Sequence, residues 1–298
     1  MSTQTLETRT RTTGIQMMTQ PSKSRLVRAL ARHLVTIVII CFLLYPVAWL
    51  VAASFRPDNQ VLSTLGLFGR FTLDNYRHGL NPAPSLHFSR FFLNSAVVAL
   101  LAVIGNVFAC TLTAYAFARL DFPFKRVLFA VLMATILLPY HVTLVPQYIL
   151  FDKLSWLNTY IPLVLPKFLG ADAFFIFLNI QFIRALPREL DDSARVDGCN
   201  HWQIFRRIIV PLSLPAMGTT AMFTFIASWN DFLGPLLYLS KTQLYTVPLG
   251  LNMFIDATGR SSYGSLFAMA VLSLVPLVAF FLAAQRMLTQ GITTTGLK

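Results

Sequence analysis

The residues whose types and spacing best suit interaction chemistry lie in residues 187–211, a polar stretch between hydrophobic runs. Three acids follow Pro187 closely: Glu189, Asp191 and Asp192. Proline suits the first turn of a helix because its missing N–H needs no partner there, and the positive end of the helix dipole stabilises carboxylates in that turn. The pattern predicts an acidic, exposed helix that begins near Pro187 and is suited to docking onto a partner.

The second half of the same stretch predicts a turn and another helix. Gly198 stands where the first helix would end, and glycine tolerates the left-handed backbone common at that position. Asn200 is a good N-cap for the next helix. That helix has an apolar face, from spacings of three and four among Trp202, Phe205 and Ile209. Apolar groups rimmed by charge usually mark an interface, so we expect a docking helix-turn-helix. The alternative is an amphipathic loop that only joins two hydrophobic runs.

The sequence contains no recognisable catalytic, metal-binding or nucleotide-binding motif. Neither G-x-x-x-x-G-K-[ST] nor G-x-G-x-x-G occurs. The three cysteines have neither disulfide-framework nor zinc spacing, and the five histidines are scattered. An intramembrane enzyme would need paired acids, a His/Glu metal motif or a serine with a base, whereas His141 and Asp231 stand alone. We therefore expect no enzyme and no metal site.

The composition predicts an integral membrane protein. The chain is 55% hydrophobic and 12% charged, whereas globular domains carry roughly 25% charged residues. The net charge of +12 comes from cations that flank apolar runs, as expected of residues that set membrane orientation rather than bind nucleic acid. Hydrophobic runs predict six spans, at about residues 34–55, 92–118, 127–150, 161–183, 212–238 and 263–285.

The spans divide the chain into a membrane domain at 33–286, a disordered basic tail at 1–32 and a short polar tail at 287–298. Six spans place both ends on one side of the membrane. Sixteen Lys and Arg residues fall on that side and seven on the other. Because cations are enriched in cytoplasmic segments, both termini and the stretch 187–211 are predicted to be cytoplasmic.

Several motifs resemble one known family. The spacing Asp192-Ser193-Ala194-x-x-x-Gly198, then nine residues, then Ile208-x-Val210-Pro211, resembles the cytoplasmic EAA loop of ABC-importer membrane subunits. The runs Ala114-Tyr115-Ala116-Phe117-Ala118-Arg119 and Trp229-Asn230 are similar to the carbohydrate-type permeases of that family. The resemblance covers about residues 34–298. Three features depart from it: Asp-Ser-Ala replaces the family's Glu-Ala-Ala, Val210-Pro211 replaces its Leu-Pro, and no glycine follows Lys298.

The resemblance implies an all-α membrane protein with the ABC type I importer permease fold: six transmembrane helices, both ends in the cytoplasm and a helix-turn-helix coupling loop. It implies that residues of this loop dock onto a separate ATPase: Glu189, Asp192, Ser193, Ala194, Asp197, Gly198, Phe205 and Pro211. It also implies contact of the segment 240–262 with a solute-binding protein and of the tail 291–298 with the ATPase.

The function implied by the resemblance is inward transport of a sugar or sugar-like solute across the cell (cytoplasmic or inner) membrane. The chain itself would bind no cofactor, because ATP and Mg²⁺ would bind the partner ATPase. The implied partners are a second permease subunit in a heterodimer, a dimer of ATP-binding subunits, an extracytoplasmic solute-binding protein and the lipid bilayer, but no nucleic acid. The rival readings are a self-sufficient secondary carrier and an intramembrane enzyme.

Polar residues inside the predicted spans are candidates for the solute pathway, because polar groups at membrane depth commonly mark one. They are Asn106, Tyr140, Thr220, Thr224, Asn230 and Asp231. Thr220 and Thr224 would equally serve hydrogen bonds between helices. Asn230 lies roughly 27 Å along its span, near the outer interface. Lys167 and Asp172 carry opposite charges five positions apart and would either pair or extend to the interface.

Overall fold

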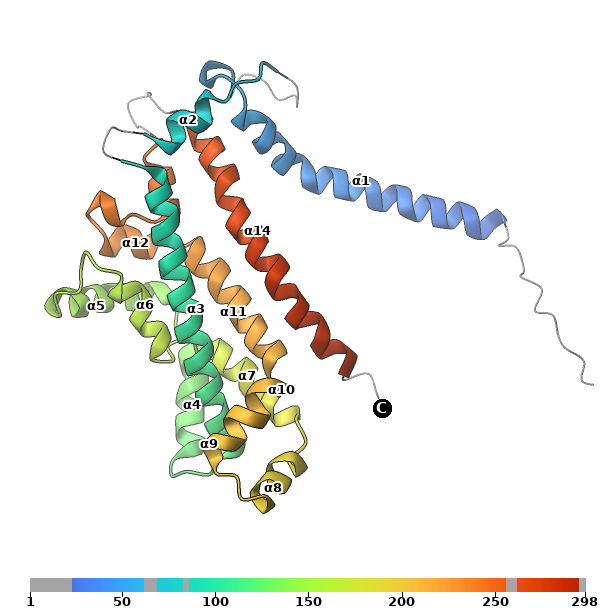
Figure 1. Cartoon of the computed structure of the whole chain (residues 1–298), viewed down its shortest axis with the longest axis vertical. Coiled ribbons are helices and arrows are strands. Elements are labelled where there is room, and N and C mark those ends of the chain that lie inside the picture. Colours follow the sequence, from blue (N-terminus) through green and yellow to red (C-terminus); the bar gives the residue numbers. More distant parts are fainter. Residues whose placement is uncertain (1–22, 62–68, 83–85, 256–261, 295–298) are drawn as a thin grey trace, which may run out of the picture. The chain divides into compact units, whose positions relative to one another are not determined.

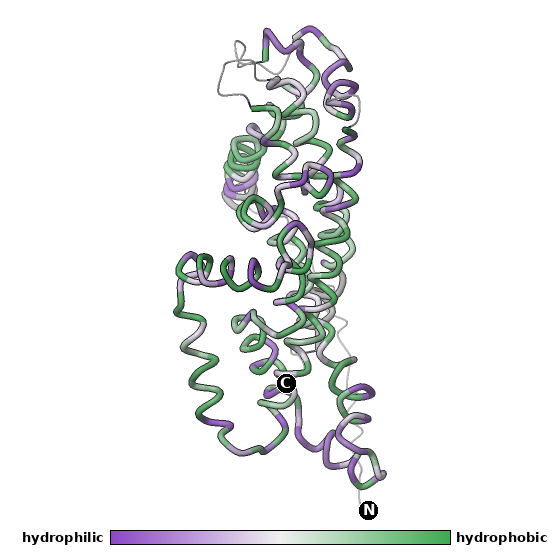
Figure 2. Tube along the Cα trace, turned by 90° about the vertical axis from the view of Figure 1, so that its left-hand side faces the viewer, coloured by the Kyte–Doolittle hydropathy of each residue, from purple (hydrophilic) through white to green (hydrophobic). Residues whose placement is uncertain are grey.

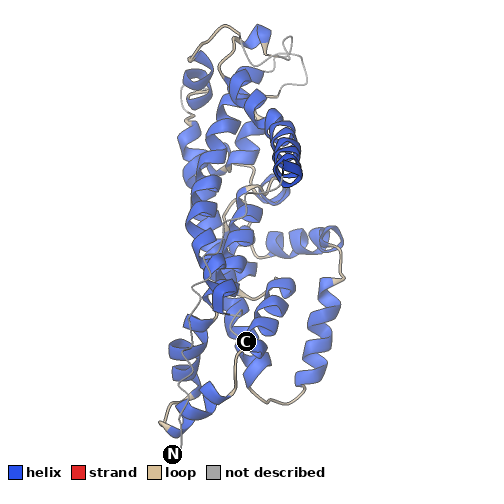
Figure 3. Cartoon of the chain, turned by 90° about the vertical axis from the view of Figure 1, so that its right-hand side faces the viewer, coloured by secondary structure: helices blue, strands red, loops and turns tan. Residues whose placement is uncertain are grey.

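A computed structural model describes residues 23–61, 69–82, 86–255 and 262–294. Every element in these ranges is helical (Figure 3), and the predicted all-α class is confirmed. The chain divides into two units, Met1–Ala48 and Trp49–Lys298. The helix α1 (Lys23–Ser54) supplies all the described structure of the first unit and enters the second. Residues 23–32, which we expected in a disordered tail, are thus helical, and residues 1–22 lie outside the described residues.

The second unit contains the remaining helices (Figure 1). They are α2 (Asp74–Leu80), α3 (Phe88–Arg119), α4 (Lys125–Ile136), α5 (Tyr140–Lys153), α6 (Ile161–Phe168), α7 (Ala173–Ala185), α8 (Glu189–Val196), α9 (His201–Ile204), α10 (Val210–Leu212), α11 (Leu214–Trp229), α12 (Leu233–Tyr238), α13 (Val247–Asn252) and α14 (Tyr263–Thr294). Two short 3-10 turns, η1 (Asp58–Gln60) and η3 (Thr242–Leu244), and one π-helical turn, η2 (Phe205–Ile209), complete the set.

Four helical segments in the described residues are long and apolar enough to cross a membrane: Leu30–Ser54, Phe88–Arg119, Ile161–Ala185 and Tyr263–Gln285. Two bent pairs bring the number to six if each pair counts as one span. One pair joins α4 to α5 at 103°, and the other joins residues His201–Leu212 to α11 at 73°.

The breaks go further than the kinks that Pro139 and Pro146 predict in the third span. The range 127–150 is broken between α4 and α5 because Leu138 precedes Pro139, and the residue before a proline avoids helical backbone. The range 161–183 is broken at residues 169–172, where Gly170 has a φ of +70°. The range 212–238 is broken after Trp229, and α12 begins only at Leu233.

The helix α3 lies at the centre of the packing and contacts α6, α7 and α11. Gly105 lets α3 approach α6 closely, because a Cβ atom at this position would overlap the ring of Phe168. One apolar cluster surrounds the C-terminal half of α3 and includes Ile180 and Ile209. A second cluster joins α11 to α14, where the rings of Phe225 and Phe280 stack with centroids 4.0 Å apart.

Much apolar surface of the second unit stays exposed, as expected of helices that face lipid. Val275, Val278 and Leu282 on α14 are each about half exposed or more. Hydrophobic residues follow the long helices in Figure 2, whereas α8, the lowest helix in Figure 1, is largely hydrophilic. The polar helix-turn-helix therefore stands out against an apolar background.

Candidate docking loop and membrane cavity

The predicted helix-turn-helix is present as α8, a turn and α9. The helix α8 begins at Glu189 with Arg188 as its N-cap, so Pro187 precedes the helix instead of occupying its first turn. Gly198 adopts the predicted left-handed backbone, with a φ of +81°. Asn200 caps α9 as predicted: the backbone N–H of Gln203 donates to Asn200 Oδ1 at 2.9 Å, and the Asn200 N–H donates to Gln203 Oε1 at 2.8 Å. Local signals in the sequence thus define this turn.

Most of the residues predicted to dock are exposed on this loop: Glu189, Asp192, Ser193, Asp197, Gly198 and Pro211. Ala194 and Phe205 differ from the others, because both are buried in the apolar cluster around α3. Their side chains pack mainly against the chain's own core. Large apolar residues exposed on the loop include Val196 and Trp202, which are 88% and 54% exposed, and Leu190, which is 39% exposed. Val196 is not among the predicted docking residues, although an apolar residue among charges is a signal that the sequence contains.

A buried ion pair fastens α8 to α3. The Nε atom of Arg119 lies 2.9 Å from Oδ2 of Asp191, and the two side chains are 3% and 7% exposed. Arg119 also donates from Nη2 to the carbonyl oxygen of Leu186 at 2.8 Å. The sequence predicts Asp191 only as one of three acids in a first turn and does not indicate its pairing with Arg119. The helical position of Asp191 turns it inward, whereas Asp192 points outward.

A cavity of about 610 Å³ lies within the membrane helices of the second unit. Its walls come from the α4–α5 bend, from α6, from the start of α7 and from the segment that joins α11 to α12. Its polar lining includes Tyr140, Thr143, Gln147, Lys167, Asp172, Ser228, Asp231 and Tyr238. The bends and breaks of the predicted spans therefore form this cavity.

The charged groups of the cavity have partners within the chain. The Nζ atom of Lys167 lies 2.8 Å from Oδ2 and 3.1 Å from Oδ1 of Asp172. Asp231 accepts a hydrogen bond from the backbone N–H of Gly234 at 3.1 Å. Pairing is one of the two alternatives that the sequence predicts for Lys167 and Asp172, and the structure shows the pair.

Only two of the six predicted pathway residues line the cavity, namely Tyr140 and Asp231. Three others are buried between helices: Asn106, Thr220 and Thr224. Asn106 Nδ2 donates to Thr224 Oγ1 at 2.7 Å. Thr220 Oγ1 accepts from Asn179 Nδ2 at 2.9 Å. Hydrogen bonding between helices, the alternative left open for the threonines, is what the structure shows.

Asn230, the sixth predicted pathway residue, is exposed and does not line the cavity. Its Nδ2 donates to the carbonyl oxygen of Ile226 at 2.9 Å, one turn back along α11. Asn230 is also the C-cap residue of α11. Its side chain therefore helps to end this helix, while its sequence neighbour Asp231 faces the cavity.

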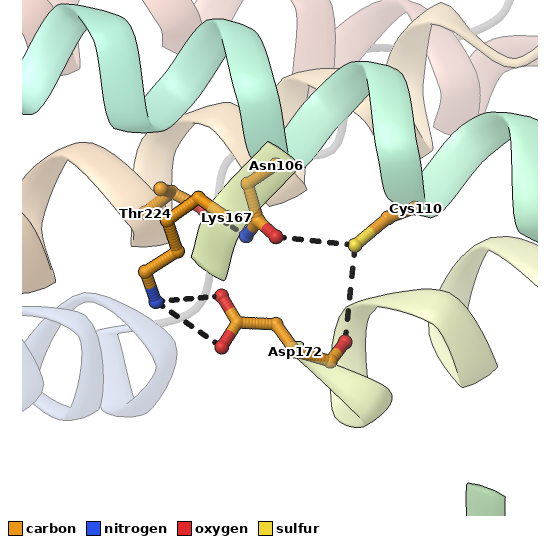
Figure 4. A network of polar contacts seen from close by, with 5 residues as sticks. All are labelled: Asn106, Cys110, Lys167, Asp172 and Thr224. Atoms are coloured by element: carbon orange, nitrogen blue, oxygen red, sulfur yellow. Dashed lines mark hydrogen bonds and ion pairs between the residues drawn. The ribbon is translucent and has the colours of Figure 1, made fainter. Parts of the chain in front are cut away.

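The cavity wall is joined to the helix core by a chain of polar contacts (Figure 4). Cys110 Sγ donates to Asn106 Oδ1 at 3.2 Å and lies 3.8 Å from the carbonyl oxygen of Asp172. The Asn106–Thr224 and Lys167–Asp172 contacts lie at the two ends of this chain. Polar groups at the α6–α7 break are thereby satisfied by neighbouring helices, as membrane depth requires.

Residues 105–294 match the sequence profile of a family described as "Binding-protein-dependent transport system inner membrane component". The chain belongs to this family. Membership agrees with the exposed docking loop and the apolar spans, and it makes the chain a multi-pass component of the cell membrane that transports solutes and is not an enzyme. In general terms, an inner membrane component of this kind works with a partner permease, an ATPase and a solute-binding protein.

Individual relatives match this inner membrane component over most of its length. It is 33% identical over 261 residues to the trehalose/maltose transport system permease protein MalG of Thermococcus litoralis, covering 87% of this chain and 92% of that one. It is 32% identical over 259 residues to the arabinooligosaccharides transport system permease protein AraQ of Halalkalibacterium halodurans, covering 85% and 91%. It is 32% identical over 269 residues to the sn-glycerol-3-phosphate transport system permease protein UgpE of Salmonella typhi, covering 87% and 94%.

A solved structure has the same fold as this inner membrane component. It is a chain from the crystal structure of a bacterial ABC transporter involved in the import of the acidic polysaccharide alginate. The TM-score is 0.76 at 18% sequence identity, and the match covers 90% of this chain and 98% of the other. The predicted importer permease fold is thus confirmed.

Proposed function

We propose that the chain is one of two membrane-spanning subunits, paired as a heterodimer, of an importer that takes up a sugar or sugar-like solute. ATP and Mg²⁺ bind a separate dimer of ATP-binding subunits, and this chain holds no cofactor. The family supports this proposal, as do relatives whose names refer to trehalose, maltose and arabinooligosaccharides.

The observation that carries the proposal is the exposed acidic surface on a rigidly built helix-turn-helix. Asp192 and Asp197 are exposed on and just after α8, while the capping box of Asn200 and the left-handed Gly198 hold the turn between the helices. A docking surface binds better when its backbone is already ordered, because less conformational entropy is lost on binding. Glu189, Asp192, Ser193, Asp197 and Gly198 would contact the ATPase directly.

The cavity suits a hydroxyl-rich solute. Its volume of about 610 Å³ lies in the range of small-molecule sites, roughly 300–1,000 Å³. Tyr140 offers an exposed aromatic face, and Thr143 and Gln147 offer hydrogen-bonding groups. Sugars are recognised by this combination of ring faces and polar side chains. Tyr140 and Asp231 are therefore the pathway residues that we retain.

A proline substitution in the docking turn tests the proposal. The full importer, with its second permease, ATPase and solute-binding protein, is reconstituted in proteoliposomes, and a thermal-shift screen of the binding protein against sugars identifies the solute to be labelled. Gly198→Pro cannot adopt a positive φ. It should abolish ATP-dependent uptake and lower recovery of the ATPase with the membrane subunits, while insertion into the membrane stays normal.

Gly198→Ala is the matched control for this substitution. A left-handed alanine costs about 1–2 kcal/mol, and the space around Gly198 is open, with no atom within 4 Å of an added Cβ. Alanine should therefore reduce uptake without abolishing it. Normal uptake by Gly198→Pro would overturn the docking assignment. Uptake that persisted with a catalytically inactive ATPase would instead support a secondary carrier.

A further inference from the structure

We propose that Arg119 and Asp191 are positioning residues that fasten the docking helix α8 to the C-terminal end of α3, so that the docking loop and α3 move together. The inference rests on the proposed function, because it concerns how a docked ATPase would act on the membrane helices. Neither residue touches the ATPase or the solute in this scheme, since both side chains are buried.

Arg119 contacts two groups of the docking loop, one through an ion pair and one through a hydrogen bond. Arg119 reaches Asp191 with Nε at 2.9 Å and the carbonyl oxygen of Leu186 with Nη2 at 2.8 Å. These two partners lie on either side of the connection between α7 and α8. A single guanidinium therefore holds both the start of the docking helix and the chain that leads into it. The ion pair with Asp191 supplies charge attraction, and the hydrogen bond from Nη2 to Leu186 has a defined direction, so the guanidinium resists sliding in a way that apolar contact does not.

The second half of the docking loop is held by the same part of α3. The hydroxyl of Tyr115 donates to the carbonyl oxygen of His201 at 3.2 Å. The rings of Tyr115 and Phe205 have centroids 5.3 Å apart. Ala194 and Ile204 join the same buried cluster. Both halves of the helix-turn-helix thus rest on the last turns of one membrane helix.

The neighbouring acid Asp192 provides a contrast. It lies 3.7 Å from Nη1 of Arg195, and its side chain is 69% exposed. A pair this exposed is screened by water and contributes little. Asp192 is therefore free to serve the partner surface, while Asp191 serves the chain's own core. Two adjacent carboxylates have different tasks because neighbouring positions on a helix point about 100° apart, which leaves Asp191 buried and Asp192 exposed.

Motion received by α3 would reach the far end of the unit. With 32 residues, α3 is about 48 Å long, and it runs from the neighbourhood of α2 to that of α9 (Figure 1). At its N-terminal end, Asn94 Nδ2 donates to the carbonyl oxygens of Gln243 and Tyr245, each at 2.9 Å. Between its ends, α3 packs against α6, α7 and α11, which contribute to the walls of the cavity.

A distance measurement tests whether α8 and α3 move together. Spin labels are placed at the exposed positions Arg188 and Phe108 in a background without the native cysteines, within the complete importer. The distance distribution is compared without nucleotide and with ATP plus EDTA, which prevents hydrolysis by removing Mg²⁺. The wild-type pair should give one narrow distribution that is the same in both conditions. In Arg119→Met and Asp191→Asn the distribution should broaden and differ between the conditions.

A coupling measurement supplies the second arm. In these two variants the ATPase should still co-purify and hydrolyse ATP, while solute transported per ATP falls by about tenfold, within the range by which residues on a coupling route alter coupling. Arg119→Lys should retain part of the wild-type ratio of solute transported to ATP hydrolysed. The double variant Arg119→Met/Asp191→Leu leaves no buried unpaired charge, so it should fold even if the single variants do not, and its ratio should stay low.

Asp121→Asn is the matched control, because Asp121 lies two residues from Arg119 with a fully exposed side chain. Asp121→Asn should match the wild type in both the spin-label distances and the solute transported per ATP. A double variant with a wild-type ratio, or a wild-type α8–α3 distance that changes with ATP, would overturn the inference. A wild-type importer that shows no ATP-dependent uptake would instead refute the proposed function, so the two failures are distinguishable.

Discussion

The ammonium group of Lys167 lies 2.8 Å from the carboxylate of Asp172, across the break between α6 and α7. Both side chains are about a quarter exposed, and both line the cavity. The pair bridges the segment where a membrane-spanning helix is interrupted and Gly170 turns left-handed. Backbone that leaves the helix at membrane depth is tolerated where it lines a cavity or is buried in protein. The ion pair links the two helix ends on either side of this interruption.

Replacement of Lys167 should therefore lower the stability of the protein at the break between α6 and α7. In Lys167→Met the carboxylate of Asp172 keeps its place at the cavity but loses its counter-ion. We expect a loss of about 1–2 kcal/mol of stability, less than for a fully buried pair because water reaches both groups. Thermal unfolding in detergent measures the change. In the double variant Lys167→Met/Asp172→Asn much of the loss should be recovered, and losses that simply add would show that the pair does not interact.

Asn106 should matter for stability and not for solute affinity. Asn106→Val removes the hydrogen bond to Thr224 and the acceptor for Cys110. Hydrogen bonds between membrane helices are worth about 0.6 kcal/mol on average and at most about 1.7 kcal/mol. We expect a loss in that range by thermal unfolding, with an unchanged KM for uptake. A KM raised without loss of stability would return Asn106 to the solute pathway.

Substitutions of Asp231 and Asn230 should have different effects on the KM for uptake, although the two residues are adjacent. Asp231 lines the cavity, whereas Asn230 bonds its own helix. Asp231→Asn keeps the shape of the side chain and removes its charge and one acceptor for solute hydroxyls. We expect the KM for uptake to rise by about tenfold, the loss of one charge-assisted hydrogen bond of about 1.4 kcal/mol. Asn230→Ala is the matched control, and an equal effect of both substitutions would contradict the assignment.

The cap at Asn200 should affect docking through the order of the turn. Asn200→Ala removes the acceptor for the Gln203 N–H, and loss of an N-cap typically costs about 1 kcal/mol. This cost destabilises the loop conformation that docks. The affinity of the membrane subunits for the ATPase should therefore fall by about fivefold. Surface plasmon resonance with the purified ATPase and membrane subunits in detergent measures it. Asn200→Asp should preserve affinity because aspartate caps equally well, and equal weakening by both variants would point to a direct contact.

Much of the docking loop was predictable because its signals are local. The glycine at 198, the cap at 200 and the acids after Pro187 each act on backbone within a few residues, so the sequence alone indicates a helix, a turn and another helix. Composition alone also indicates a membrane protein. Pro139 predicts a kink from the sequence alone, whereas the angle of 103° between α4 and α5 depends on how α5 packs.

The sequence by itself determined the class of the protein, the apolar spans and the local form of the docking turn, because hydropathy and capping depend on neighbouring residues. Only the tertiary structure decided which polar groups pair with one another and which line the cavity. Asp191 pairs with Arg119 and Asn106 with Thr224 across long stretches of chain, while Tyr140 and Asp231 meet at one cavity. Those partnerships follow from how the helices are rotated and packed, and a list of residue types along a single helix does not specify the rotation.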